Sequence, residues 1–212
     1  DSVKNALPDW NNGTGGVAVF SDGCVKVPIT TSNGKNAQYN FPSALSGKVG
    51  VEVEVNFDNL TPETAGTGYA NALYVGGTEG WGQQLIYQPS TKKITEKNIK
   101  YTTEKEYTGW TTITLIVDTD NDTADLYVNG EAIKKGAALV NNLSDITMLA
   151  VGAGNIKFSA APATNYEEYL LLRKVRTYKA VEEGGASMPT AENLNISEAN
   201  GVLTGDYTFN PN

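Results

Sequence analysis

Hydrophobic residues in this chain recur mainly at every second position, in short runs separated by Gly, Asn and Asp. In residues 49–57 the odd positions are all apolar, and Glu52, Glu54 and Asn56 fall between them. Successive side chains of a strand point to opposite faces, so this segment predicts a strand with one face in the core and the other in water. No window keeps a helical period, and we therefore expect few helices.

Residues 110–131 contain the clearest hairpin pattern. The strand predicted at 111–118 carries apolar residues at alternate positions, and the acidic turn 120–122 follows it. A second alternating strand at 124–128 ends at Asn129-Gly130, a dipeptide that favours tight hairpin turns. The segment therefore predicts an antiparallel hairpin with one buried face and a further chain reversal after it.

Strands of this kind are predicted along most of the chain. They lie at residues 17–20, 24–30, 37–41, 48–57, 70–75, 83–87, 92–95, 111–118, 124–128, 146–151, 156–159 and 166–178. Their regular spacing predicts an all-β fold, a sandwich of two antiparallel sheets. In the last strand Leu170-Leu171-Leu172 breaks the alternation, which indicates a strand covered on both faces in the middle of a sheet.

A domain boundary is predicted after Ala180. Residues 1–180 form the predicted sandwich, residues 181–187 have the composition of a linker, and residues 188–212 begin a new pattern. The last segment is too short for a complete domain. It is either part of a neighbouring domain or a tail packed on the main one, and the start at Asp1 suggests a piece of a larger protein.

Composition excludes several partners. The net charge of -8 and the scattered lysines argue against nucleic acid and anionic membranes, because phosphate binding needs a basic patch. Cys24 is the one cysteine, so no intramolecular disulfide forms, and its apolar surroundings favour inert packing. No apolar run is long enough for a membrane span.

Three motifs resemble known families. The hairpin at 110–131 and the segment LSGKVGVEVEV at 45–55 are similar to laminin-G-like modules of the concanavalin A-like jelly rolls, found in bacterial surface and polysaccharide-degrading proteins. The tail 188–212 resembles the start of a bacterial immunoglobulin-like repeat. The resemblance implies a jelly-roll fold and sugar binding rather than catalysis. Arg173 stands where many related modules have an aspartate that helps to hold calcium.

Catalytic chemistry finds little support in the sequence. The chain has no histidine, which removes Ser-His-Asp and Cys-His arrangements and the usual zinc sites. Glu52 and Glu54 share a strand face at a separation relevant to glycosidases, but the third acidic residue of the E-x-D-x-x-E strand in glucanases of this fold is absent. We therefore predict a protein that is not an enzyme, with this pair on a solvated face.

Residues 118–125 are the one local candidate for a metal site. Their alternate acidic oxygens suit calcium, a hard ion that binds carboxylates and carbonyls. The loop lacks the glycine and glutamate of an EF-hand, and Asp and Asn are ordinary turn residues. The sequence thus requires no cofactor and leaves a structural calcium ion open.

Residues 68–88 best match the needs of sugar binding, which are flat aromatic faces and fixed amides or carboxylates. The candidate carbohydrate-binding residues are Trp81, Tyr74, Tyr87, Gln84 and, from a separate loop, Trp10. For each aromatic residue the alternative is ordinary packing in a strand or core. Trp110 is predicted to pack structurally, as its counterpart in the similar modules does.

The predicted function is a non-catalytic module that holds a larger secreted or cell-surface protein near a polysaccharide or other glycan. Its expected partners are that glycan and adjacent modules of the same protein. Two alternatives stay open, a protein-binding or adhesive module and a structural spacer, because one fold serves many functions.

Overall fold

The computed structural model describes residues 10–13, 19–21, 23–28, 35–62, 68–98, 101–154, 168–180, 191–195, 197–199, 202–204 and 207–209. Within these residues the chain forms strands and no helix. The strand predicted at 156–159 lies outside them, as do the ends of those predicted at 17–20, 24–30 and 166–178. No helix in the described part of the chain is long and apolar enough to cross a membrane.

The strands are β1 (Trp10–Gly13), β2 (Val19–Ser21), β3 (Cys24–Pro28), β4 (Lys35–Leu45), β5 (Lys48–Asn56), β6 (Ala70–Gly77), β7 (Gly80–Gln88), β8 (Lys93–Glu96), β9 (Trp110–Asp118), β10 (Thr123–Val128), β11 (Glu131–Ala138), β12 (Ile146–Gly154), β13 (Tyr169–Lys179), β14 (Ala191–Asn195), β15 (Ser197–Ala199), β16 (Val202–Thr204) and β17 (Tyr207–Phe209).

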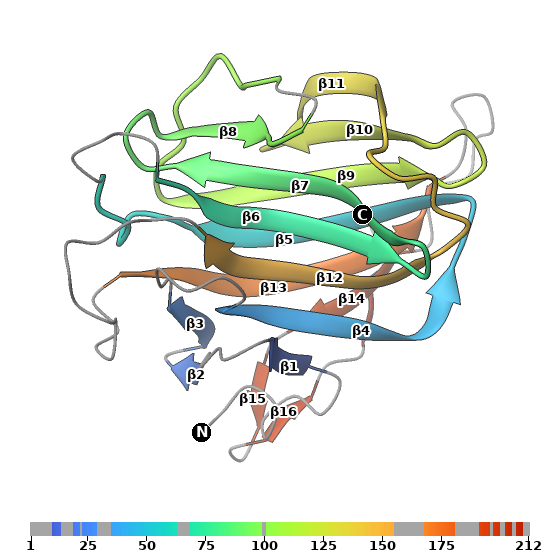
Figure 1. The fold of residues 1–212 in the computed structure, drawn as a ribbon. Coiled ribbons are helices and arrows are strands. Elements are labelled where there is room, and N and C mark those ends of the chain that lie inside the picture. Colours follow the sequence, from blue (N-terminus) through green and yellow to red (C-terminus); the bar gives the residue numbers. More distant parts are fainter. Residues whose placement is uncertain are drawn as a thin grey trace.

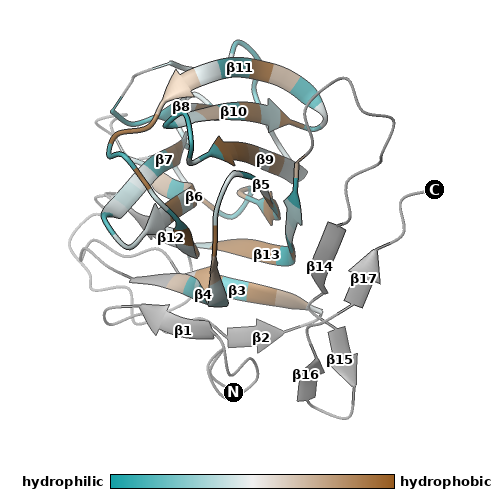
Figure 2. Cartoon of the chain, turned by 90° about the vertical axis from the view of Figure 1, so that its right-hand side faces the viewer, coloured by the Kyte–Doolittle hydropathy of each residue, from teal (hydrophilic) through white to brown (hydrophobic). Residues whose placement is uncertain are grey.

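Two antiparallel sheets form the sandwich. The six-stranded sheet has the order β1-β4-β12-β6-β7-β8, and the larger sheet runs β11-β10-β9-β5-β13-β14-β17, with β3 and β2 attached through β13. Figure 1 shows β4, β12, β6 and β7 in front of β13, β5 and β9, and Figure 2 shows these two layers side by side. The predicted all-β jelly-roll sandwich is therefore confirmed.

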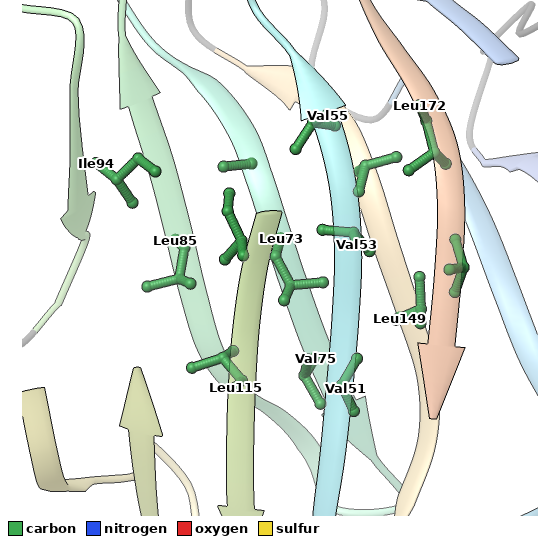
Figure 3. Packing of buried hydrophobic residues seen from close by; sticks show 14 of the residues in the cluster. Val51, Val53, Val55, Leu73, Val75, Leu85, Ile94, Leu115, Leu149 and Leu172 are labelled. Carbon is green, nitrogen blue, oxygen red and sulfur yellow. The ribbon is translucent and has the colours of Figure 1, made fainter. Parts of the chain in front are cut away.

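The core fills the space between the two sheets (Figure 3). Val51, Val53 and Val55 of β5 point inward and are fully buried, and Leu73 of β6 and Leu85 of β7 meet them from the opposite sheet. The alternating valines predicted this face of β5 correctly. Each fully buried aliphatic side chain contributes about 1.5–3 kcal/mol, so a core of this size stabilises the fold without a disulfide.

β13 lies in the middle of its sheet, as the leucine triplet predicted. β5 pairs along one side of it, while β3 and β14 share the other side in succession. Leu170 and Leu172 face the core and are fully buried, and Leu171 is half-buried on the outer face. Strand β14 of the tail thus extends the main sheet. The division of the chain at 180 stays a prediction.

The two predicted turns around β10 are present. Asn129 and Gly130 both have positive φ, 50° and 78°, in the two-residue connection between Val128 and Glu131. This combination fits a tight hairpin turn whose twist matches the flanking strands. The acidic turn joins Asp118 to Thr123, with Asp122 at φ 53°.

Candidate functional site

One row of side chains crosses the outer face of the six-stranded sheet. Cross-strand pairing places Gln38 of β4 opposite Ala150 of β12, Ala150 opposite Tyr74 of β6, and Tyr74 opposite Gln84 of β7. Paired residues point to the same side of a sheet, and their neighbours Leu73, Val75, Leu85 and Leu149 fill the core. The row therefore faces away from the core and spans roughly 14 Å across four strands.

An aromatic pair stands beside this row. The rings of Tyr74 and Trp81 are 6.0 Å apart between centroids with an interplanar angle of 26°. Both side chains are half-buried, and burial raises the pKa of Tyr74 above its ordinary value. An offset pair of this kind presents a continuous apolar surface with a hydroxyl and an indole N–H at its edges.

A glycine allows this arrangement. Gly76 lies opposite both Trp81 and Met148, and a Cβ there would be 3.0 Å from the carbonyl oxygen of Gly80 and 3.1 Å from the sulfur of Met148. The register also shifts between Val75 and Gly76, so Trp81 reaches the same side as Tyr74 although the two are an odd number of residues apart. The bulge thus turns the Trp81 side chain to the outer face of the sheet.

Two amide pairs flank Tyr74 on this face. Gln84 Nε2 donates to Asn71 Oδ1 at 2.7 Å, and Gln38 Nε2 donates to Asn40 Oδ1 at the same distance. Each bond fixes two side chains relative to each other. The outer face thus carries fixed amides on both sides of Tyr74.

The hairpin turn that carries Trp81 is tied to the loop at 141–145. Asp145 accepts hydrogen bonds from the backbone N–H and the hydroxyl of Thr78, both at 2.7 Å. Glu79 accepts hydrogen bonds from the backbone and hydroxyl of Ser144, which lower the pKa of Glu79. Asn141 Nδ2 donates to the carbonyl oxygen of Trp81 at 2.7 Å. These bonds hold the turn and its indole in one position.

Two lysines lie at the β8 side of this face, Lys97 beside Gln84 at the end of the row and Lys93 of β8, which pairs with Gln88 and precedes the buried Ile94. Lys97 donates its backbone N–H to the carbonyl oxygen of Gln84 at 3.0 Å, and its ammonium donates to the hydroxyl of Tyr69 at 2.7 Å. The carboxylates of Glu79 and Asp145 lie beyond Trp81 along the strands, in the β6–β7 turn and the 141–145 loop. The middle of the row is uncharged.

The structure brings together three of the five predicted binding residues, Trp81, Tyr74 and Gln84. Tyr87 is instead a core residue, which corrects the expectation of an exposed ring. It is 3% exposed, its ring stacks on Phe57 at 4.1 Å between centroids, and its hydroxyl donates to the carbonyl oxygen of Tyr107. Burial raises the pKa of Tyr87 to about 12. Trp10 begins β1 opposite Tyr39, and its side chain lies outside the described residues.

Sequence reasoning missed Gln38, Asn40 and Asn71. The first two come from β4, far from the aromatic segment in sequence, and only the order β4-β12-β6 brings them to Tyr74. Asn71 falls inside residues 68–88, the segment predicted to bind sugar, and it has an amide of the kind that bonds sugar hydroxyls. Alternation along the strand indicates only that Gln38 and Asn40, which flank the buried Tyr39, point away from the core.

Glu52 and Glu54 lie on the outer face of the larger sheet and are engaged in ion pairs. Glu52 accepts hydrogen bonds from Thr114 at 2.8 Å and Arg176 at 3.0 Å, and it is only 8% exposed. Glu54 pairs with Arg173 at 2.6 Å. The predicted solvated face is therefore wrong for Glu52, because its basic and hydroxyl neighbours cover it.

Trp110 packs on the outer face of the larger sheet. It lies opposite Asn56 on this outer face, half-buried, and the guanidinium of Arg173 stacks over its ring at 4.1 Å. It therefore packs against a charged side chain at the surface rather than in the core. Arg173, the residue in the place of a calcium-binding aspartate, serves here to join Trp110 and Glu54.

The acidic loop at 118–125 forms hydrogen bonds within the protein. Asp118 accepts from the backbone of Asp120 and from both the backbone and side chain of Asn121. Asp122 and Asp125 accept from the backbone of Leu143 and Gly136. No group of three or more acidic, Cys or His residues is arranged to hold a metal ion in the described part of the chain. The carboxylates of the loop are thus engaged in hydrogen bonds that hold the turn and its neighbours.

No family model and no curated protein matches the sequence. Solved structures share the fold. A sialidase aligns over 82% of this chain at 12% identity with a TM-score of 0.61, and this chain covers 17% of its length. A sialidase of Trypanosoma rangeli in complex with sialic acid aligns over 78% of this chain at 13% identity and a TM-score of 0.53, with 27% of its own length covered.

Two further structures align over most of their own length. The carbohydrate recognition domain of Emp46p, in its potassium-bound form, aligns over 86% of this chain and 94% of its own at 12% identity and a TM-score of 0.56. It is also solved in a metal-free form. The alginate lyase Aly36B, a mutant with alginate trisaccharide, aligns over 78% and 85% at 11% identity and a TM-score of 0.52. These similarities show the lectin-like jelly-roll fold.

Proposed function

We propose that this chain is a non-catalytic carbohydrate-binding module and that the outer face of the six-stranded sheet binds the glycan. The observation that carries the proposal is the row Gln38, Ala150, Tyr74 and Gln84 with Trp81 beside it. Aromatic rings stack on the apolar side of a pyranose, and fixed amides bond its hydroxyls. A row that combines aromatic rings with amides suits a glycan chain that runs across the strands.

The fold comparisons support a function connected with glycans. A carbohydrate recognition domain, sialidases and an alginate lyase share this sandwich. Their chemistry differs, so the similarity supports the class of ligand and not a reaction.

The absence of catalysis rests on the side chains themselves. The chain has no histidine, and Glu52 and Glu54, the glycosidase-like pair, are held by Arg176 and Arg173 on the opposite side of the molecule from the row. Tyr74 is the ionisable residue of the row, and its raised pKa keeps it protonated and unsuited to act as a base. We expect no hydrolysis or elimination of polysaccharides.

Secretion and attachment to a larger protein complete the proposal. Both come from the resemblance of the hairpin and of the tail 188–212 to modules of bacterial surface and polysaccharide-degrading proteins. A binding module increases the local concentration of its parent protein on a polysaccharide by mass action. No cofactor is needed for such a role.

The test is affinity electrophoresis of the purified chain through gels containing soluble polysaccharides. We expect retardation by at least one glycan and a loss of affinity of about tenfold or more in Trp81→Ala and in Tyr74→Ala. Tyr127→Ala is the matched control, because Tyr127 is a half-buried tyrosine on the outer face of the other sheet. Its affinity should equal that of the parent.

Other outcomes identify the alternatives. Retardation by no glycan, with intact folding, favours an adhesive or spacer module. Equal losses in Tyr127→Ala and Trp81→Ala place any binding site elsewhere.

A further inference from the structure

We infer that the glycan bound by this face is a neutral one, made of uncharged sugars rather than uronic or sialic acids. The inference rests on the proposed function and names the substrate class of that site. It departs from the ligands bound in solved structures that share the fold, which include an alginate trisaccharide and sialic acid.

The first argument is the hydrogen-bonding capacity of the amide pairs. In the pair Gln84 and Asn71, the hydrogen bond joins Gln84 Nε2 to Asn71 Oδ1. The Nδ2 group of Asn71 and the Oε1 atom of Gln84 therefore have no partner among the described residues and can bond a ligand. The pair Gln38 and Asn40 repeats this arrangement. If both amides of a pair were turned over, the pair would still offer one donor and one acceptor.

Sugar hydroxyls match such a pair because each can donate and accept. A carboxylate only accepts hydrogen bonds, so it would satisfy the N–H side of each pair and leave the amide oxygen facing another acceptor. An amide oxygen that loses its water and gains no donor costs about 1–3 kcal/mol. Two such pairs in one row therefore favour hydroxyls over carboxylates at the positions of the ligand that face them.

The second argument is the distribution of charge. Glu79 and Asp145 lie in the turn that carries Trp81 and in the loop tied to it, so the negative charges at this end of the strands oppose the approach of an acidic sugar to the indole. The whole chain carries a net charge of -8, which lowers the local concentration of polyanions. Both effects oppose a polymer with a carboxylate on every unit.

Lys97 is the strongest argument for the opposite result. Its ammonium sits at the β8 end of the row and already donates to the hydroxyl of Tyr69. Lys97, with Lys93 further along the same edge of the sheet, can hold a carboxylate at that edge, whereas the other units of a uronate chain across the row would lie over uncharged side chains. The balance favours neutral sugars, and Lys97 becomes the residue to test.

The experiment compares polysaccharides that differ only in charge. Polygalacturonate and alginate are each tested beside their carboxyl-reduced forms, in which every uronate has become a neutral hexose, together with soluble glucans, mannans, galactans and xylans. Affinity is measured by titration calorimetry for the parent, for Lys97→Gln and for Trp81→Ala, with folding checked by circular dichroism.

The expected result is binding of at least one neutral polymer that weakens about tenfold or more in Trp81→Ala. Lys97→Gln should leave that affinity unchanged, and raising NaCl from about 0.05 to 0.5 M should change it by less than about threefold, since no ion pair forms. An acidic polymer should bind more weakly than its reduced form.

Two results overturn the inference in distinguishable ways. An acidic polymer that binds best, loses affinity on reduction or in salt, and depends on both Trp81 and Lys97 would leave the glycan-binding function standing and refute neutral selectivity. If the folded chain binds none of the polymers, the proposed function and the inference are both refuted.

Discussion

Arg173 links two side chains on the outer face of the larger sheet. Its guanidinium donates to Glu54 at 2.6 Å and stacks over Trp110 at 4.1 Å. The hydrogen bond from Arg173 is the main reason that the pKa of Glu54 is lowered. Arg173 is 43% exposed, so water weakens the pair, and its effect on stability is modest.

The pH dependence of stability tests this pair. Because the pKa of Glu54 is lower in the folded state, the unfolded state binds more protons, and the contribution of Glu54 is present at neutral pH and lost as pH falls below its ordinary value of 4.5. Glu54→Gln should lower the free energy of unfolding by about 0.5–1 kcal/mol at pH 7. In urea titrations the difference between Glu54→Gln and the parent should shrink as the pH falls below 4.5, because the Glu54 carboxylate becomes protonated in both states. A difference that persists unchanged there would show that the charge is not its cause.

Trp110 and Phe57 make a second test at this scale. Trp110 is half-buried under Arg173, so Trp110→Ala should cost about 1–2 kcal/mol through lost area and a lost cation–π contact. Phe57 is 1% exposed and stacked on Tyr87, and Phe57→Ala should cost about 3–5 kcal/mol. Denaturant unfolding of both variants compares them. A larger loss for Trp110→Ala would place that ring in the core.

Alternation of residues predicts the site only where the register is regular. Tyr87 is two residues from Leu85 and shares its inward face, so parity alone identifies it as a core residue. Odd–even alternation does not predict the face on which Trp81 lies, because the register shifts between Val75 and Gly76. Gln38 and Asn40 needed the order of the strands, which no local pattern contains.

At the scale of elements, the strands found from the sequence are those with a buried face. β5, β9 and β10 alternate cleanly, and their turns carry Asn, Asp and Gly. β11 was missed because its segment, EAIKKGAA, lies at the edge of the sheet and is mostly exposed. β1 was missed too, since its residues WNNG resemble a loop. Pairing with a neighbouring strand, rather than burial of its own side chains, defines an edge strand.

The β6–β7 turn depends on close backbone packing that can be tested with glycine variants. A Cβ at Gly77 would lie 2.0 Å from the carbonyl oxygen of Asp145, so Gly77→Ala must displace the 141–145 loop. We expect a loss of about 3 kcal/mol. Gly130→Ala is the control, because its surroundings are open and only its φ of 78° is strained, at about 1–2 kcal/mol.

Thermal unfolding of the two glycine variants separates packing from strain. Gly77→Ala should have the lower midpoint and should also weaken any glycan binding that needs Trp81, while Gly130→Ala should bind normally. If Gly77→Ala is as stable as the parent, the hydrogen bonds of Thr78 and Glu79 to the loop do not hold the turn.

At the scale of the whole molecule, the sandwich followed from the spacing of alternating segments, whereas the place of the tail did not. β14 pairs with β13 from Lys174 to Tyr178, along the half of its side that β3 leaves open. Linker composition at 181–187 indicates a connection but cannot tell whether the next strand returns to the same sheet. The resemblance of 188–212 to an immunoglobulin-like repeat stays a prediction.

Deletion of residues 188–212 tests the role of this pairing. β13 keeps its pairing with β5 from Leu171 to Lys179, so the shortened chain should still unfold cooperatively, with a midpoint lower by about 2–6 °C. The uncovered edge of β13 should promote self-association, seen by light scattering at high concentration. An unchanged midpoint would mean that β14 adds nothing to stability, and loss of folding would mean that the tail is an essential part of the sandwich.

The central claim is that a glycan binds on the outer face of the six-stranded sheet, and the indole signals test it most directly. The chain has three tryptophans, so their Nε1–H resonances in ¹H–¹⁵N spectra can be assigned with single substitutions. The resonances are then followed during titration with a polysaccharide that retards the chain in affinity electrophoresis. Trp81 should shift and saturate with the ligand, while Trp110, on the other sheet beneath Arg173, should stay in place. A saturating shift of Trp110 with Trp81 unmoved would contradict the account.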